Sequence, residues 1–209
     1  AELLGGKGAE SDTEVLLMLV AFLQELGFRD LKVLLNTVGD EPSRAAYRET
    51  LVGFLNSHRE KLSEESVRRL ATNPLRVLDS KSPLEQELLA GAPQLADSLT
   101  AASVMHFAAV RRALEQFDVA YEVSPRLVRG LDYYTNTVFE IVSAGLGAQN
   151  AICGGGAYEG LVEELGGPPT YGVGFAIGED RLIEVLPQQS PARSRAPGPV
   201  VVSRIGKAP

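Results

Sequence analysis

Cysteine, tryptophan and histidine are scarce in this sequence, whose 209 residues contain one, none and two of them, respectively. Because Cys153 has no second cysteine to pair with, an internal disulfide and a multi-thiolate metal site are both excluded. We expect Cys153 to be a small buried residue beside the glycines that follow it. His58 and His106 lie far apart in helical patterns, so packed or solvent-facing roles are expected for both. The sequence therefore predicts no metal site.

An excess of positive charge and a long hydrophobic run are also lacking. Lys and Arg number 20 against 27 Asp and Glu, which gives a formal net charge of −7, and the basic residues are scattered. A domain that binds nucleic acid by itself usually presents a basic face, because the release of counterions drives its affinity. Any main RNA-contact surface is therefore expected elsewhere. No apolar run reaches the roughly 18 residues of a membrane span, and no signal-like segment begins the chain, so we expect a cytoplasmic protein without membrane contact.

Common templates for nucleotide binding and nucleophilic catalysis are absent. The triplet Gly154-Gly155-Gly156 matches neither G-x-G-x-x-G nor a Walker loop, and such a triplet usually forms a turn. The sequence contains no Ser-His-Asp pattern and no Cys-His pair that would indicate a nucleophile. Any catalysis must therefore depend on another kind of site.

Helical signals dominate the first half of the chain. Ser11 to Glu14 fits a capping box, and apolar residues at helical spacing follow it to Leu26. A short apolar strand is expected over Leu31 to Asp40, where Asp40 and Pro42 begin a second helix that extends to about Leu62.

Three more helices are expected before residue 118. They cover Ser63 to Leu70, a segment from the capping box Ser82-Pro83-Leu84-Glu85 to about Ala90, and Thr100 to about Phe117. The apolar stripe of the last helix is predicted to comprise Val104, Phe107, Val110 and Leu114.

Strand patterns return after the helices, at residues 120–123, 138–142 and 148–153. Residues 171–186 then pass from a glycine-rich strand into a helix. Strands that flank a helical segment indicate an α+β domain with an antiparallel sheet. We expect a core part at 1–40, a helical insertion at 41–118, a second core part at 119–186, and a linker with the start of a further domain at 187–209.

Arginines beside glycines form the first candidate site. Arg129 precedes Gly130, and Arg181 follows a loop with Gly172, Gly174 and Gly178. Arginine holds phosphate well because its planar charged fork matches the phosphate oxygens, and a backbone without Cβ lets a ligand come close. Alternatively, these arginines form ordinary surface ion pairs or lie on a helix face.

Tyrosines form the second candidate. Tyr133, Tyr134 and Tyr158 could offer hydroxyls and ring faces to a small polar ligand, or they could be core or interface aromatics. From the residues alone, both alternatives stay open.

Several segments, in order along nearly the whole chain, resemble one enzyme family. "LVRGLDYYTNTVFE" is similar to the histidine-specific signature of histidyl-tRNA synthetases, and "CGGGAYEGLVEELGG" to their second histidine-binding segment. "GVGFAIGEDRLI" resembles the third motif of class II synthetases, and "TNPLRVLDSK" resembles part of the helical insertion. The resemblance implies a class II synthetase-like antiparallel sheet flanked by helices, with an all-helical insertion.

The resemblance also implies roles for single residues. Arg129 would lie at the α-phosphate of ATP and stabilise charge as the histidine carboxylate attacks and pyrophosphate leaves. Tyr134 and Tyr158 would contact the substrate imidazole, and Gly154 and Gly155 would belong to the same histidine site.

Further residues would complete the two substrate sites. Arg181 and Gly178 would lie against ATP, which would bring Mg²⁺ with it. Glu2 stands where the second motif ends in a carboxylate that holds the substrate ammonium. The partners implied are histidine, ATP and a tRNA bound mostly by regions outside this chain, within a homodimeric full-length protein.

The sequence departs from the family pattern at four positions. Ala157 and Glu159 replace the arginine and aspartate of G-G-R-Y-D, Asp180 precedes Arg181 where glutamate is common, and Asn136 takes a position that is often glycine. The first motif, most of the second and the anticodon-binding domain have no counterpart here. We therefore expect the middle half of a synthetase, with little or no activity alone.

Two other functions remain open from the sequence. One is the regulatory subunit of ATP phosphoribosyltransferase, a non-catalytic paralogue without an anticodon domain. The other is an inactive remnant that only folds. The R-G-L-D-Y-Y segment, Arg181 and the long helical block favour the synthetase.

Overall fold

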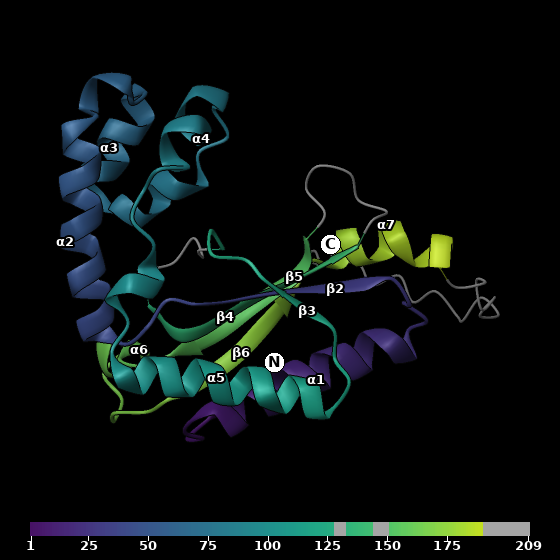
Figure 1. The fold of residues 1–209 in the computed structure, drawn as a ribbon. Helices are drawn as coiled ribbons and strands as arrows, with labels where there is room; N and C mark the ends of the chain where they lie inside the picture. The colour runs from purple at the N-terminus through teal and green to yellow at the C-terminus, as the bar shows by residue number, and fades with distance from the viewer. Residues whose placement is uncertain (128–132, 144–150, 190–209) are drawn as a thin grey trace, which may run out of the picture.

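A computed structural model describes residues 1–127, 133–143 and 151–189. Its centre is a six-stranded sheet in the order β1-β6-β5-β4-β2-β3. All neighbouring strands are antiparallel except β2 and β3. The predicted α+β class with an antiparallel sheet is therefore confirmed (Figure 1). The strands are β1 Glu2–Leu4, β2 Leu31–Thr37, β3 Tyr121–Val123, β4 Tyr134–Ser143, β5 Ala151–Tyr158 and β6 Gly172–Ile177.

The glycine triplet lies inside β5, so the expectation of a turn there was wrong. The reason is the close approach of the neighbouring strands. A Cβ on Gly155 would lie 2.8 Å from Cα of Phe175, and one on Gly156 would lie 2.5 Å from the Thr137 carbonyl oxygen. Cys153, just before the triplet, is 5% exposed, as predicted.

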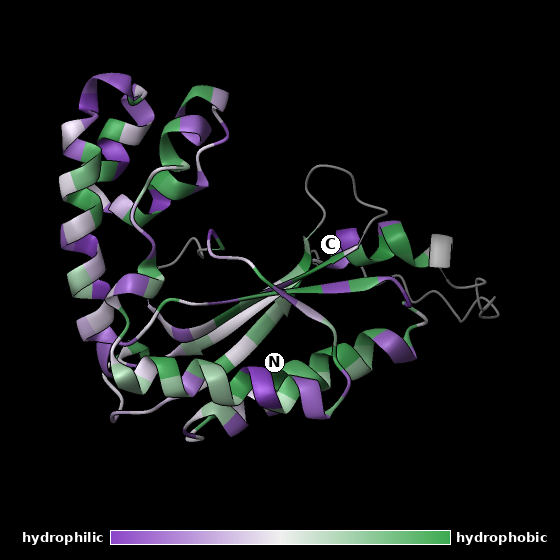
Figure 2. Ribbon diagram, viewed as in Figure 1, coloured by the Kyte–Doolittle hydropathy of each residue, from purple (hydrophilic) through white to green (hydrophobic). Residues whose placement is uncertain are grey.

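Helices α1 (Ala9–Glu25) and α5 (Ala101–Gln116) cover one face of the sheet (Figure 1). The apolar residues of α1 recur at helical spacing, and Leu16, Leu19 and Leu23 are fully buried against the sheet. Figure 2 shows this helix as hydrophobic along much of its length. Gly27, with a φ of 98°, follows the helix end as predicted.

The beginning of α1 differs from the prediction. The helix starts at Ala9 after Gly8, so Ser11 to Glu14 are not a capping box. Thr13 instead donates from Oγ1 to the Ala9 carbonyl (2.6 Å). The side chain of Asp12 is fully buried, where it accepts hydrogen bonds from elements distant in sequence.

A helical block stands on the other side of the sheet (Figure 1). Its apolar residues form a second cluster around Tyr47, Leu51 and Leu55, which Val138 of β4 joins. Figure 2 shows many hydrophilic residues on α3. The block comprises α2 Glu41–Ser57, η1 Arg59–Lys61, α3 Glu64–Thr72, η2 Pro74–Asp79, α4 Pro83–Leu89 and η3 Leu95–Ser98.

Most helix starts in the block agree with the prediction. Asp40 caps α2 by accepting from the Ser43 amide (3.0 Å), and Ser63 caps α3. Helix α4 exists, but its capping box was wrong, because Ser82 makes no side-chain cap bond. Glu85 is instead 2% exposed and turns into the block, where it accepts from the Ser63 amide (2.6 Å).

Helix α5 shares its core with the sheet and α1 through Val110 and Leu114, which are fully buried. Val104 is 50% exposed, so the predicted stripe was wrong at this position. Two helices complete the described chain, α6 (Leu161–Glu164) and α7 (Glu179–Gln189). None of the described helices is long and apolar enough to cross a membrane.

Candidate functional site

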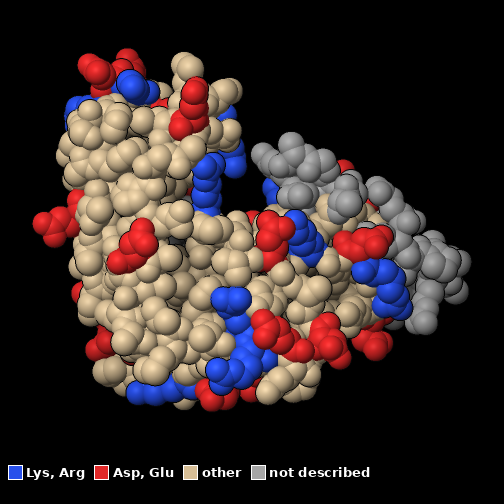
Figure 3. Space-filling view, viewed as in Figure 1, with Lys and Arg blue, Asp and Glu red and all other residues tan. Residues whose placement is uncertain are grey.

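The sheet face that does not meet α1 and α5 is formed in part by two glycines of β6, Gly172 and Gly174, which we call the glycine floor. Val173 and Phe175 of β6 belong to the apolar cluster around α1. Because side chains alternate along a strand, Gly172 and Gly174 point to the opposite face. On this side the molecule is hollowed between the helical block and the rest of the fold, and Lys and Arg are interspersed with Asp and Glu (Figure 3).

Glu2 and Tyr158 meet on this floor. The Tyr158 hydroxyl donates to Glu2 Oε2 at 2.9 Å, although the two residues are 156 positions apart in sequence. They meet because β1 and β5 both flank β6, with Glu2 opposite Gly174 and Tyr158 opposite Gly172. Burial and this hydrogen bond raise the pKa of Tyr158 to about 12, so its hydroxyl remains a donor at neutral pH.

The two glycines make room for these side chains. A Cβ on Gly172 would lie 2.6 Å from the Tyr158 hydroxyl oxygen, and one on Gly174 would meet the Glu2 carboxylate. The sequence predicted that these glycines let a ligand approach. In the structure they let Glu2 and Tyr158 lie close over the sheet.

Two further tyrosines border the site: Tyr134, the first residue of β4, and Tyr133 just before it. The Tyr133 ring lies 4.6 Å from the Tyr134 ring and 5.7 Å from that of Tyr158, edge-on, between centroids. Burial and the neighbouring Tyr134 hydroxyl raise the pKa of Tyr133 to about 12. A carboxylate beside several tyrosine hydroxyls and rings suits a small ligand that carries an ammonium group and a polar ring.

The segment of β5 beneath this site contains Gly154, Gly155 and Gly156. Gly155 faces the opposite side of the sheet, since a Cβ there would lie 2.9 Å from the Phe139 ring. A Cβ on Gly156 would lie 2.9 Å from the Tyr134 ring. The structure thus brings together Glu2, Tyr134 and Tyr158, as well as the glycine segment between them.

Arg181 and Gly178 lie at the opposite end of β5. Arg181 Nη1 donates to the Ala151 carbonyl at 2.9 Å, and the Gly178 amide donates to the Ile152 carbonyl at 3.0 Å. Because β5 spans Ala151–Tyr158, this end is roughly 23 Å from Tyr158 at about 3.3 Å per residue. The two predicted substrate sites therefore lie along one strand. Arg129 falls outside the described residues.

Arg44 was not predicted as a site residue from the sequence. This residue lies in the first turns of α2, and its Nη1 donates to the Tyr134 carbonyl oxygen. No motif in the sequence marks it, since the contact depends on the position of the helical block over β4.

Two of the family departures have a structural explanation. Asn136 has a φ of 49°, a left-handed conformation that glycine adopts freely and asparagine tolerates. Ala157 is fully buried and pairs with Thr135 and Val173 in the apolar cluster of the sheet, where an uncharged methyl group packs well. The structure gives no explanation for Glu159 or Asp180.

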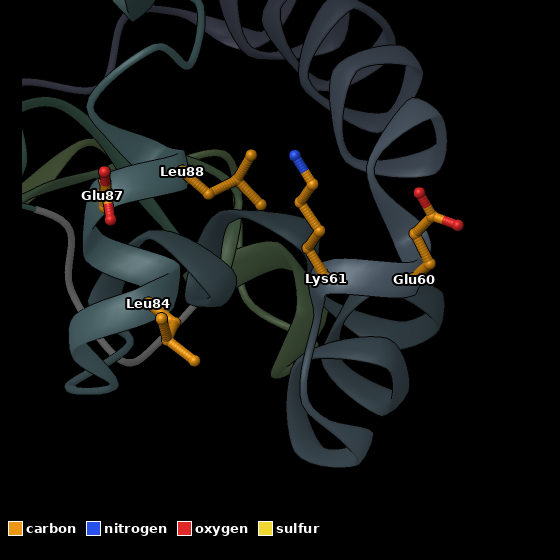
Figure 4. A pocket seen from close by; sticks show the side chains of 5 residues that line it. All are labelled: Glu60, Lys61, Leu84, Glu87 and Leu88. Atoms are coloured by element: carbon orange, nitrogen blue, oxygen red, sulfur yellow. The ribbon is translucent and has the colours of Figure 1, made fainter.

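Other cavities lie away from this site. One of about 500 Å³ lies between η1 and α4, where Lys61 and Leu88 reach into the space between the two segments (Figure 4). Another of about 320 Å³ lies between the block and the chain after β3, beside Tyr47 and Arg126. Within residues 1–127, 133–143 and 151–189, no group of three or more His, Cys, Asp or Glu could hold a metal ion.

A family model and curated relatives of this chain indicate the same family. The model of the family described as "Histidyl-tRNA synthetase" matches residues 1–182. A histidine–tRNA ligase from Halorhodospira halophila is 50% identical over 198 residues, which cover 94% of this chain and 47% of that protein. One from Thermosynechococcus vestitus is 46% identical over 195 residues, or 93% of this chain and 46% of that protein. The chain thus spans about half the length of these relatives.

Solved structures with a similar fold include a member of the same family. The apo histidyl-tRNA synthetase of S. aureus superposes with a TM-score of 0.73 at 34% identity, covering 90% of this chain and 46% of that one. A Bacillus halodurans C protein described as an ATP phosphoribosyltransferase regulatory subunit/histidyl-tRNA synthetase has a TM-score of 0.55 at 23% identity, covering 88% and 52%. At that identity it shares the fold alone.

Proposed function

The chain belongs to the histidyl-tRNA synthetase family, and we propose that its parent protein activates histidine with ATP and transfers it to the 3′ end of a tRNA. In the first step the histidine carboxylate attacks the α-phosphate, histidyl-adenylate forms and pyrophosphate leaves. The glycine floor, with Glu2, Tyr134 and Tyr158, would be the histidine-binding part of that centre.

The histidine site has the groups that this substrate requires. Glu2 would accept hydrogen bonds from the α-ammonium group, and Tyr134 and Tyr158 would hydrogen-bond the imidazole. Gly154 would allow the substrate to lie close to β5, whereas Gly155, which faces the other side of the sheet, would make room for the Phe139 ring beneath the site. The observation that carries the proposal is the 2.9 Å hydrogen bond from Tyr158 to Glu2, because it unites residues from opposite ends of the chain on an open, side-chain-poor surface.

ATP would extend from this site along β5. Arg181 and Gly178 would contact it at the Ala151 end, and Arg129 would neutralise the charge that develops on the α-phosphate oxygens. Mg²⁺ would come bound to the ATP phosphates. Among the described residues no group of three or more His, Cys, Asp or Glu could hold the ion, so the phosphates would be its ligands.

The larger organisation is also a proposal. The chain would comprise core parts at 1–40 and 119–186, a helical insertion at 41–118 and a linker from 187, although α5 packs with the sheet. The parent would be a cytoplasmic homodimer that contacts tRNA mostly through other regions. For the regulatory-subunit alternative, the likeness to the Bacillus halodurans C protein at 23% identity concerns the fold alone.

Histidine-dependent exchange of pyrophosphate into ATP tests this function in the complete polypeptide encoded by the gene. We expect exchange in the wild type, and a rise of roughly tenfold or more in the KM for histidine in Tyr158→Phe, since loss of the hydroxyl would leave a buried imidazole nitrogen without its partner, which costs about 1–3 kcal/mol. Tyr121→Phe is the control, because Tyr121 lies at the far edge of the sheet and donates to Glu115. A wild type without exchange would contradict the proposal.

A further inference from the structure

The helical block joins the rest of the fold through two junctions that meet at one carboxylate. The chain enters the block at Asp40, before α2, and leaves it at Thr100, before α5. Asp40 Oδ1 accepts from the Ser43 amide at 3.0 Å, and Oδ2 accepts from the Thr100 hydroxyl at 2.6 Å. The Ser43 hydroxyl also accepts from the Thr100 amide at 2.9 Å. Asp40 therefore ties the entry of the block to its exit.

The same junction is bonded to a distorted part of β4. The Asp40 amide donates to the Ser103 hydroxyl (2.9 Å), which lies 3.3 Å from Asn136 Oδ1 and donates to it. The backbones also pair, since the Asn136 amide donates to the Gly39 carbonyl (2.8 Å) and the Val38 amide donates to the Asn136 carbonyl (2.7 Å). Asn136 has a left-handed backbone where the pairing of β4 with β5 shifts register.

Tyr134 is held from the same direction. It lies two residues before Asn136, and its carbonyl oxygen accepts from Arg44 Nη1. Arg44 is fixed in the first turn of α2, where its amide donates to the Asp40 carbonyl (3.0 Å). The Thr135 hydroxyl donates to the Gly39 carbonyl (3.1 Å), so the whole segment before the distortion is bonded to the junction.

From these contacts we infer that Asp40 is a positioning residue for histidine, because its side chain ties the start of α2 to the start of α5, whose Ser103 bonds to Asn136, and so places Tyr134 in the substrate site. This inference rests on the proposed function. Asp40 does not touch the substrate, and its effect passes through Asn136 and Arg44. Displacement of a binding group by about 1 Å can reduce the rate by as much as 100-fold, so a small rotation of the block matters.

Asp40→Asn tests the inference in the complete polypeptide. Asparagine has nearly the same shape and still caps a helix, but it lacks the charge and one of the two acceptor oxygens that join Ser43 to Thr100. We expect the KM for histidine in pyrophosphate exchange to rise about fivefold or more, with a smaller change in the KM for ATP. Asp40→Glu, which keeps the carboxylate, should recover part of the loss.

Glu85→Gln is the matched control. Glu85 is also a carboxylate held by hydroxyl groups, from Ser66 (2.9 Å) and Ser80, but it lies inside the helical block, away from the sheet. This variant should loosen the block and leave the KM for histidine within about twofold of the wild type.

The outcomes separate the two proposals. If the wild type shows no exchange, the proposed function fails and the inference fails with it. If the wild type is active but Asp40→Asn changes the KM for histidine no more than Glu85→Gln, only the inference is overturned. Should Asp40→Asn fail to fold, Ser103→Ala decides, because it removes the link to Asn136 while the Asp40 cap on α2 remains. A KM for histidine unchanged in that variant also overturns the inference.

Discussion

Replacement of Tyr171 by phenylalanine should weaken the layer beneath the proposed histidine site. The Tyr171 hydroxyl donates to Asp12 Oδ1 at 2.7 Å, and His106 Nε2 lies 2.8 Å from Asp12 Oδ2. Asp12 is 0% exposed and Tyr171 is 7% exposed. These bonds join α1, α5 and the residue just before β6, so they hold the helices under the strand that carries Gly172 and Gly174.

The magnitude follows from burial. Loss of a hydrogen bond to a buried carboxylate costs about 1.5–3 kcal/mol, because one oxygen loses its donor where water cannot replace it. The phenyl ring itself still packs, so no large cavity adds to the cost. We expect a decrease of about 2 kcal/mol in the local free energy of opening, which is roughly a 30-fold acceleration of amide exchange.

Hydrogen exchange followed by mass spectrometry measures this in the complete polypeptide at neutral pH. Peptides from α1 and β6 should exchange faster in Tyr171→Phe, and peptides from α3 should change little. Tyr121→Phe is the control, because Tyr121 donates to Glu115 (2.6 Å) at an exposed edge. Acceleration below about twofold in α1, or an equal effect in both variants, would show that the Tyr171–Asp12 bond does not hold this layer.

Two further predictions concern the helical block. Gly53→Ala should stabilise α2 by about 0.8–1 kcal/mol and slow amide exchange there about fivefold. The reason is that Gly53 lies inside the helix and no atom lies within 4 Å of the added Cβ. Unchanged or faster exchange would contradict this prediction. The second concerns acid. Burial alone would raise the pKa of Asp40 and of Glu85, but their hydrogen bonds lower both below the ordinary values of 3.8 and 4.5. The two ionised carboxylates therefore stabilise the fold above these pH values, and this stabilisation is lost as the pH falls below them. Helical circular dichroism in moderate urea should decrease from about pH 4.5 downward. The decrease should be less steep in the double variant Asp40→Asn/Glu85→Gln than in the wild type. Equal slopes would contradict that assignment.

Local signals predicted much of the fold. Asp40 and Thr100 begin helices as the sequence indicates, and Gly27 follows the end of α1, because caps depend on a few neighbouring residues. The role of Asp12 could not be predicted from local sequence signals. It lies in a segment that fits a capping box, but its partners, His106 and Tyr171, are distant in sequence, so only the packing of α1 against α5 and β6 shows its role.

The candidate site shows the same division. Tyr134, Tyr158 and the glycine segments were identified from motifs, and Glu2 from the edge of one. That Tyr158 bonds to Glu2 required the strand order, because β6 lies between their strands. Arg44 could not be found at all, since its contact with the Tyr134 carbonyl depends on the orientation of the helical block.

Calorimetric titration of histidine into the complete wild-type polypeptide and its Tyr158→Phe variant tests whether histidine binds beside Glu2 and Tyr158. We expect saturable binding of one histidine per chain in the wild type, and affinity at least about tenfold weaker in the variant, while Tyr121→Phe binds as the wild type does. Equal affinity in the wild type and Tyr158→Phe would contradict the histidine site placed on this glycine floor.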